Sequence, residues 1–146
     1  MSTWLLEHDN EGEVYTRPHC DKALIQEVLS SFNGSSIFYC CLSDKTDESF
    51  LCCMGEPDRR IIEGRVFEDD TMFDFALRKR PGENGGNVSV RYGMQPDELA
   101  EVESSEILTA TEALAVFHSF FGSKKIPDDF VPISKSRLLA LPSVND

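Results

Sequence analysis

Residues 109–127, TATEALAVFHSFFGSKKIP, contain the clearest helix of this 146-residue chain. Thr109 and Glu112 have the T-x-x-E spacing of a capping box, in which each side chain accepts a hydrogen bond from a free backbone N–H. Gly122 can adopt the left-handed conformation that ends a helix, and Pro127 prevents the helix from resuming. Apolar residues recur at helical spacing between these limits: Ala113, Phe117, Phe120 and Phe121, with Leu114 beside them. Three phenylalanines on one side predict a helix that covers a sheet.

A second amphipathic helix is expected near the N-terminus. Asp21 has the side chain of a good N-cap, and Asn33-Gly34 has the chemistry of a C-cap. The apolar stripe between these two ends has helical spacing and consists of Leu24, Ile25, Val28, Leu29 and Phe32.

Short apolar runs between the two helices predict strands. Residues 37–42 and 50–54 are apolar on both faces, which is typical of central strands, and residues 60–67 form a weaker strand interrupted by Gly64. Residues 71–80 alternate, with Phe73, Phe75 and Leu77 on one face and Asp74, Ala76 and Arg78 on the other. After the loop at 81–86, residues 88–92 are expected to return as the second strand of a hairpin.

These elements predict an α+β fold with a mostly antiparallel sheet of about five strands, on which an N-terminal and a C-terminal helix pack. We expect residues 1–146 to form a single domain. Residues 1–17 are expected to form an arm or an edge strand, with Trp4 and Tyr15 as anchors. Residues 107–108 could add a short strand, and residues 128–146 are expected to form an extended tail.

The charge balance is the strongest compositional signal. The chain has 14 basic and 26 acidic residues and a net charge of −12, a field that repels nucleic acids and anionic membranes and attracts cationic partners. An acidic surface that only aids solubility is the simplest explanation for one acidic block. Three blocks without a basic residue favour a basic partner instead: Glu7, Asp9, Glu11 and Glu13; Glu68, Asp69, Asp70 and Asp74; and Asp97, Glu98, Glu101, Glu103, Glu106 and Glu112.

Hydropathy predicts a cytoplasmic protein. No uninterrupted run of about 18 apolar residues occurs, so no transmembrane helix is expected. Glu7 interrupts the apolar start at residues 4–6, and no basic flank precedes it, so no signal peptide is expected.

The five cysteines favour reduced, metal-free thiols and no cofactor. Neighbouring strand residues point to opposite faces, so neither Cys40-Cys41 nor Cys52-Cys53 can easily present two thiolates to one ion. The C-x-x-C spacing of many zinc sites is absent, and Cys20 stands apart. One cross-strand pair could approach disulfide distance, but a cytoplasmic location favours free thiols that pack as small apolar side chains.

No residue pattern indicates an enzyme. His8, His19 and His118 are scattered, and no G-x-S-x-G, H-E-x-x-H or phosphate-binding loop occurs. The pair Asp69-Asp70 lacks the remaining ligands of a calcium loop, so ordinary surface acidity explains it. We therefore expect no catalytic site and no metal site.

Residues 92–127, YGMQPDELAEVESSEILTATEALAVFHSFFGSKKIP, resemble a known family. A strand that ends in Tyr-Gly, an acidic linker and a capped helix with E-A-x-x-x-x-F-x-x-F-F are similar to the first-described immunity-protein family of bacterial polymorphic toxin systems. That family often carries Trp shortly after the final Pro, where this chain has Phe130. The resemblance implies a small α+β inhibitor that binds a cognate toxin, such as a deaminase or a nuclease.

Together, the charge and the resemblance predict an immunity protein that covers a basic toxin cleft with an acidic surface. A cytoplasmic adaptor or chaperone for a basic protein is the alternative, and a small enzyme or ligand carrier is a third. The identity of the toxin and the oligomeric state stay open. The expected contact residues are seven acids and two aromatic anchors: Glu68, Asp69, Asp70, Asp97, Glu98, Glu101, Glu103, Trp4 and Tyr92.

Overall fold

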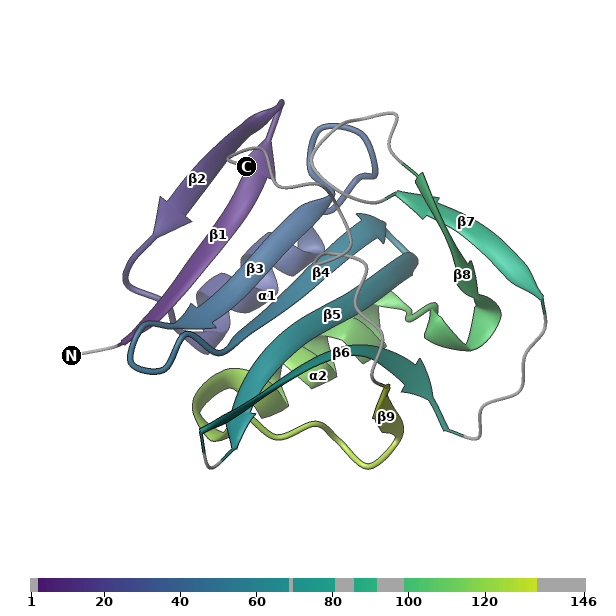
Figure 1. Cartoon of the computed structure of the whole chain (residues 1–146). Helices are drawn as coiled ribbons and strands as arrows, with labels where there is room; N and C mark the ends of the chain where they lie inside the picture. Colours follow the sequence, from purple (N-terminus) through teal and green to yellow (C-terminus); the bar gives the residue numbers. More distant parts are fainter. Residues whose placement is uncertain (1–2, 69, 81–85, 92–98, 134–146) are drawn as a thin grey trace, which may run out of the picture.

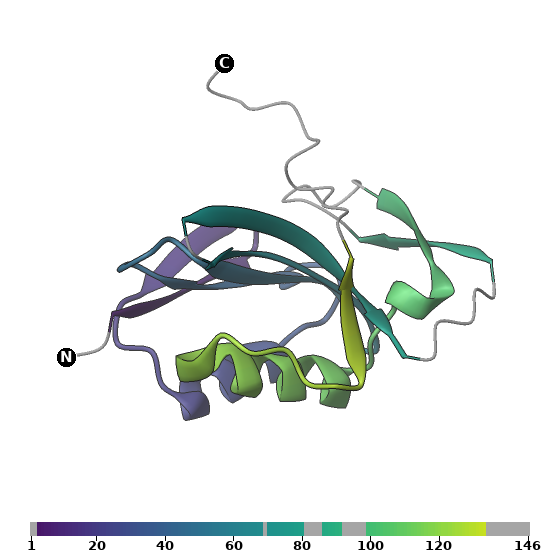
Figure 2. The ribbon, with the colours of Figure 1, turned by 60° about the horizontal axis from the view of Figure 1, so that its bottom comes forward.

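The chain folds around a seven-stranded antiparallel sheet (Figure 1). A computed structural model of the chain describes residues 3–68, 70–80, 86–91 and 99–133, with only the backbone described at Glu68 and Arg91. Both helices lie on one face of the sheet, and a two-stranded hairpin packs against the other face (Figure 2). This arrangement confirms the α+β class and the antiparallel sheet.

The seven strands run in the order β2-β1-β3-β4-β5-β6-β9. In chain order they are β1 (Trp4–Asn10), β2 (Glu13–Arg17), β3 (Tyr39–Asp44), β4 (Phe50–Glu56), β5 (Arg59–Glu68), β6 (Thr71–Lys79) and β9 (Phe130–Ile133). The separate hairpin consists of β7 (Asn87–Arg91) and β8 (Leu99–Glu103). The helices are α1 (Lys22–Ser30), the 3-10 helix η1 (Ser104–Glu106) and α2 (Ala110–Ser123).

Two segments enlarge the sheet beyond the predicted five strands. Residues 4–17 form the β1–β2 hairpin, which confirms the edge strand predicted for this region and adds a second strand to it. Residues 130–133 form β9, which pairs with β6 from Lys79↔Phe130 to Ala76↔Ile133. The prediction of an extended tail from residue 128 is therefore wrong at β9, and residues 134–146 lie outside the described residues.

The predicted hairpin between residues 71–80 and 88–92 is also wrong. β6 is flanked by β5 and β9, so neither of its edges is free for β7. β7 instead pairs with β8, with Val88 opposite Val102 and Val90 opposite Ala100. β8 lies in the acidic segment that the sequence indicated as a linker. The segment resembles a linker because its acids point outward and only Ala100 and Val102 face the sheet. The short strand expected at residues 107–108 is an isolated bridge between Leu108 and Arg60.

Helix α1 begins as predicted and ends earlier. The Asp21 carboxylate accepts a hydrogen bond from the Leu24 amide at 2.8 Å, which is N-cap geometry. The helix ends at Ser30, with Ser31 as its C-cap, before Asn33-Gly34 is reached. The Asn33 side chain instead accepts from the amides of three following residues, Ser35, Ser36 and Ile37, and so forms the turn toward β3.

Helix α2 begins at the predicted capping box and buries most of the predicted face, but Phe121 is half-buried and already departs from helical geometry. Thr109 Oγ1 accepts from the Glu112 amide at 3.2 Å, and the Glu112 carboxylate accepts from the Thr109 amide at 2.8 Å. Gly122 adopts a φ of 90°, which ends the helical geometry. Phe117 and Phe120 are fully buried in the core that contains Phe75, which confirms that this helix covers the sheet.

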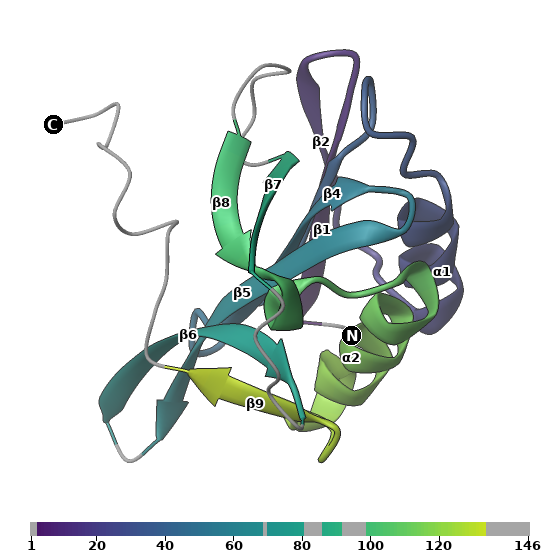
Figure 3. The same ribbon diagram turned by 90° about the vertical axis from the view of Figure 1, so that its right-hand side faces the viewer.

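A second, smaller core lies on the opposite face of the sheet, under the β7–β8 hairpin (Figure 3). Its buried side chains come from five strands of the sheet and hairpin: Cys41, Cys52, Met54, Ile61, Val90 and Val102. The sequence predicted that β3 and β4 are apolar on both sides, and both faces of these strands are indeed covered.

Candidate partner-binding surface

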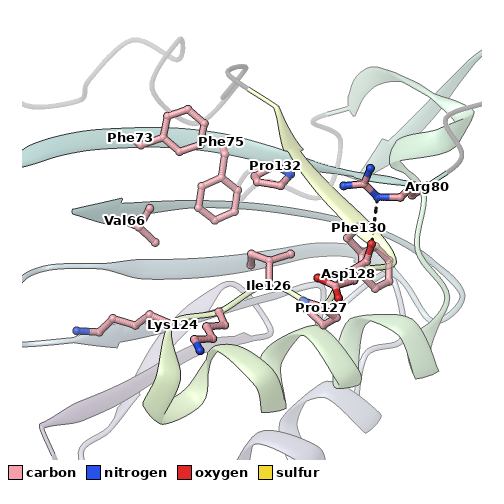
Figure 4. Close-up of a pocket in the computed structure, with 11 residues that line it drawn as sticks. Val66, Phe73, Phe75, Arg80, Lys124, Ile126, Pro127, Asp128, Phe130 and Pro132 are labelled. Atoms are coloured by element: carbon pink, nitrogen blue, oxygen red, sulfur yellow. Dashed lines mark hydrogen bonds between the residues drawn. The ribbon is translucent and has the colours of Figure 1, made fainter. Parts of the chain in front are cut away.

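The groove in Figure 4, of about 640 Å³, lies between β6 and the segment that connects α2 to β9. Phe75 and Phe130 form its buried floor, and Arg80 lies at one end of it. Its other apolar lining comes from β5, β6 and the α2–β9 connection: Val66, Phe73, Ile126, Pro127 and Pro132. Such a groove can receive an apolar side chain of a partner.

Phe73 lies at the rim of this groove and is 37% exposed. The alternation of β6 placed it on the same face as Phe75, and the two rings do stack with their centroids 6.1 Å apart. Phe75 belongs to the core beneath α2, whereas Phe73, two residues closer to the β5–β6 turn, lies outside that core. Phe73 therefore shares the predicted face with Phe75 but stays partly exposed, because the helix layer does not extend over the end of the hairpin.

The β5–β6 hairpin tip, residues 68–73, carries a second exposed apolar side chain. Met72 is 49% exposed and points to the face opposite Phe73. Glu68 pairs with Thr71 at the end of the hairpin, and Asp70 is exposed with a φ of 66°. The tip therefore presents an apolar side chain on each face next to an acidic turn.

Behind the tip, the nearest carboxylate is already paired. Asp74 accepts from Arg65 Nε at 2.7 Å, and the same guanidinium lies 5.6 Å from the centroid of the Phe50 ring. This contact fixes the hairpin without contributing a free charge to its surface.

Lys124 and Arg80 in the groove wall are engaged with neighbouring groups, whereas the Lys125 side chain, which also lines the groove, has no ion pair among the described residues. Lys124 Nζ lies 2.7 Å from Asp44 and 2.6 Å from Asp47, and Arg80 Nε donates to the Asp128 carbonyl at 3.1 Å. Burial disfavours the charged form of Asp44, but hydrogen bonds from Lys124 and Thr46 outweigh it and lower the Asp44 pKa to about 2. The Lys124 cluster therefore joins the β3–β4 turn to the end of α2.

The acids predicted as contacts do not form one patch. Asp70 lies at the β5–β6 turn and Glu101 is exposed on β8, at opposite ends of the molecule (Figure 1). Glu103 is half-buried at the start of η1, where its amide donates to the Glu106 carboxylate at 2.9 Å. Glu68 is described through its backbone only, and four predicted contacts lie outside the described residues: Asp69, Asp97, Glu98 and Tyr92.

Trp4 is not a protruding anchor. Its ring is half-buried, 5.9 Å from the Phe120 ring and 5.4 Å from the Phe121 ring between centroids. It therefore attaches β1 to the end of α2. Tyr15, on the edge strand β2, is 43% exposed, and its hydroxyl donates to Glu13 at 3.1 Å.

Asp9 is buried, unlike the solvated surface acid that its place in the N-terminal acidic block suggested. It is 1% exposed, and its carboxylate accepts from the amides of Phe38 and Tyr39 at 3.0 Å each. Burial raises the Asp9 pKa, although these two hydrogen bonds oppose the rise. Asp9 therefore connects β1 to the start of β3.

All five cysteines are buried free thiols. As the alternation predicted, the two cysteines of each CC pair lie on opposite faces of the sheet. Cys40 and Cys53 are cross-strand partners on the helix-covered face, and Cys41 and Cys52 are cross-strand partners on the other face. The Sγ atoms of Cys41 and Cys52 are 2.7 Å apart. Across the described ranges, no group of three or more His, Cys, Asp or Glu side chains could hold a metal ion.

Met72 and Phe73 were missed as surface residues because no local sequence signal marks them. Their exposure depends on how far the helices extend under the sheet, which is a property of the whole fold. Comparisons of the chain with protein-family models, curated proteins and solved structures gave no match. In the part of the chain described here, neither α-helix has the length and apolar character that crossing a membrane requires.

Proposed function

We propose that this chain is an immunity protein that neutralises a toxin by binding its basic active-site cleft through the β5–β6 hairpin tip. One observation carries the proposal: Met72 and Phe73, 49% and 37% exposed, lie directly beside the acidic turn at the tip. The resemblance of residues 92–127 to an immunity family and the net charge of −12 support the same function.

The tip has the physical character of an interface centre. Interfaces obtain most of their binding energy from a few large side chains that lose contact with water, and charged residues around them contribute less. Burying the exposed part of Met72 and Phe73 would stabilise a complex by roughly 1 kcal/mol each. Asp70 lies beside them and would attract the cations of the toxin cleft during association.

The groove next to Phe73 extends this surface. An apolar side chain of the toxin could occupy its apolar part, because Lys124 is held by Asp44 and Asp47 and Arg80 by a carbonyl, which leaves Lys125 as the cation of the lining that the toxin would meet. The toxin would then meet an apolar centre at Phe73 and a carboxylate at the turn.

Co-expression with the product of the neighbouring gene tests the function. The unmodified chain should restore growth to cells that express this product. Met72→Ser/Phe73→Ser should protect poorly, because it removes the apolar contact. Val14→Ser/Tyr15→Ser is the matched control, since these two residues are similarly exposed on β2 at the far edge of the sheet. The control should protect fully.

The outcomes separate the function from the surface. A neighbouring product that is harmless, or toxicity that the unmodified chain does not relieve, contradicts the immunity function. Binding without relief of toxicity would instead support an adaptor for a basic protein. Equal protection by both double variants would keep the immunity function and reject the β5–β6 tip as the contact surface.

A further inference from the structure

Arg60 is a buried cation without a carboxylate partner. It lies on β5, is 2% exposed, and forms no ion pair among the described residues, although the chain carries 26 acids. Within the described part of the chain, its Nη1 atom has no hydrogen-bond partner. A buried charge that lacks a counter-charge destabilises the fold strongly, so this guanidinium requires an explanation.

The contacts around Arg60 compensate its charge in part. Nε donates to the carbonyls of Glu56 and Pro57 at 3.3 and 3.0 Å, and the guanidinium carbon lies 4.5 Å from the centroid of the Phe32 ring. The neighbouring thiol adds no negative charge, because burial raises the pKa of Cys53 to about 12 even though Arg60 lowers it. Two carbonyl dipoles and the face of the Phe32 ring therefore surround the cation, and none of these groups carries a negative charge.

A cavity of about 140 Å³ adjoins Arg60, between the end of α1 and the start of α2. Its lining combines the guanidinium with two hydroxyl residues and three apolar ones: Leu29, Ser30, Arg60, Ala110, Thr111 and Leu114. The cavity is larger than the roughly 30 Å³ that one water occupies in the liquid. It can therefore hold a single tetrahedral oxyanion.

The first turn of α2 adds a second source of positive potential. Ala110 donates its amide to Asp58 at 3.2 Å, and Glu112 donates its amide to Thr109 Oγ1. No hydrogen bond of the Thr111 amide is found among the described residues. A free N–H in the first turn of a helix is a preferred donor to phosphate and sulfate.

Three groups oppose an anion at this position, and one of them, the Glu112 carboxylate in the first turn of α2, is paired with Lys79 at 3.7 Å. Asp58 is exposed, so solvent screens its charge, and the C-terminal end of α1 contributes only a partial negative charge at Ser30. A full buried positive charge next to a free helix amide outweighs these effects.

We propose that Arg60 and the first turn of α2 form a binding site for a small oxyanion of the size of inorganic phosphate or sulfate. The Arg60 guanidinium and the Thr111 amide are the donors, and Ser30 and Thr111 line the cavity beside them. The anion would join α1 to α2 and neutralise the cation beneath them. This site is independent of the β5–β6 tip and of any protein partner.

Phosphate titrations of the whole protein test the site. Thermal unfolding is followed in increasing inorganic phosphate against chloride at equal ionic strength, and the amide resonance of Thr111 is recorded in the same series. Phosphate also stabilises proteins without specific binding, so saturation is the required signature. We expect a saturable rise in the unfolding midpoint and a saturable shift of the Thr111 resonance with the same apparent affinity.

Matched variants locate the site. Arg60→Met should weaken phosphate binding at least ~10-fold, as expected for loss of one charge-assisted hydrogen bond. Arg59→Met changes the net charge equally at an exposed residue outside the cavity and should leave the affinity unchanged. Thr111→Glu brings a carboxylate to the cavity and should abolish the response, whereas Ala115→Glu, one turn further along α2, should retain it.

Every outcome decides the proposal. If Arg60→Met does not fold, the Thr111→Glu and Ala115→Glu pair and the Thr111 resonance test the same site without altering Arg60. A response that never saturates, a Thr111 resonance that does not move, or wild-type affinity in Thr111→Glu would each overturn the proposal. An equal loss of affinity in Arg59→Met and Arg60→Met would also overturn it, because a general charge effect would then explain the binding.

Discussion

The carboxylate of Asp44 lies 2.7 Å from Lys124 Nζ and is almost fully buried. Its pKa of about 2 in the folded protein is below the ordinary value of 3.8, so its contribution to stability is present above pH 3.8 and is lost as the pH falls toward 2. We expect this carboxylate to contribute about 2 kcal/mol to the free energy of unfolding at neutral pH.

Urea unfolding of Asp44→Asn between about pH 5 and pH 2 measures this contribution. The variant should be less stable than the original chain at the upper end of this range, and the difference should disappear at the lower end. Asp128→Asn, at an exposed residue, is the control and should follow the original chain. A constant difference across the range would show that Asp44 acts through packing and not through its charge.

The thiols give a second prediction at this scale. Burial raises the pKa of Cys20 to about 11 and that of Cys53 to about 12, so both stay protonated at neutral pH. Iodoacetamide should modify the folded chain slowly and all five cysteines rapidly in denaturant, as read by mass spectrometry. Rapid modification of the folded chain would contradict this burial, and stoichiometric zinc in the purified protein would contradict the prediction that the thiols are metal-free.

At the scale of elements, Phe117 tests the packing of α2 on the sheet. Phe117 is fully buried, so Phe117→Ala should lower the free energy of unfolding by about 3–5 kcal/mol through lost contacts and a cavity. Phe121 is half-buried beside Trp4, and Phe121→Ala should cost clearly less. Urea unfolding of both variants gives the comparison, and equal losses would mean that α2 presents a different face to the core.

Local chemistry made the helices and the central strands predictable. Asp21, Thr109 and Glu112 act on amides within three residues of themselves, so their spacing alone indicates where helices begin. The apolar runs of β3 and β4 reflect burial on both faces. Gly64, which weakened the prediction of β5, is required there, because a Cβ would lie 2.5 Å from the Phe50 carbonyl oxygen and 2.8 Å from the Phe75 ring.

Strand partners could not be predicted in the same way. β6 and β7 have compatible patterns, but β6 pairs with β9, which is about fifty residues further along the chain. In the sequence, Asp9 likewise resembles the surface acids around it, yet its carboxylate accepts hydrogen bonds from amides 29 and 30 residues away. Contacts of this kind depend on the assembled sheet and leave no periodic signal in the sequence.

At the scale of the whole molecule, the acidic character was predictable and the arrangement of the acids was not. Ion pairs neutralise some carboxylates, such as Asp74 and Asp47, while Glu101 and Asp70 are exposed at distant ends. Composition could therefore indicate a basic partner without indicating where it binds. Exposed apolar side chains also lie beside other acids, as Val14 and Tyr15 do beside Glu13, but among the described residues only at the β5–β6 tip does such a side chain, Phe73, also line the groove of about 640 Å³.

The affinity between the purified chain and the product of the neighbouring gene tests this account most directly. Calorimetry should show Met72→Ser/Phe73→Ser binding at least ~10-fold more weakly than the original chain, as expected for two side chains at an interface centre. Val14→Ser/Tyr15→Ser should bind as the original chain does. Equal affinities for the two double variants, with both of them folded, would contradict the β5–β6 tip as the partner-binding surface.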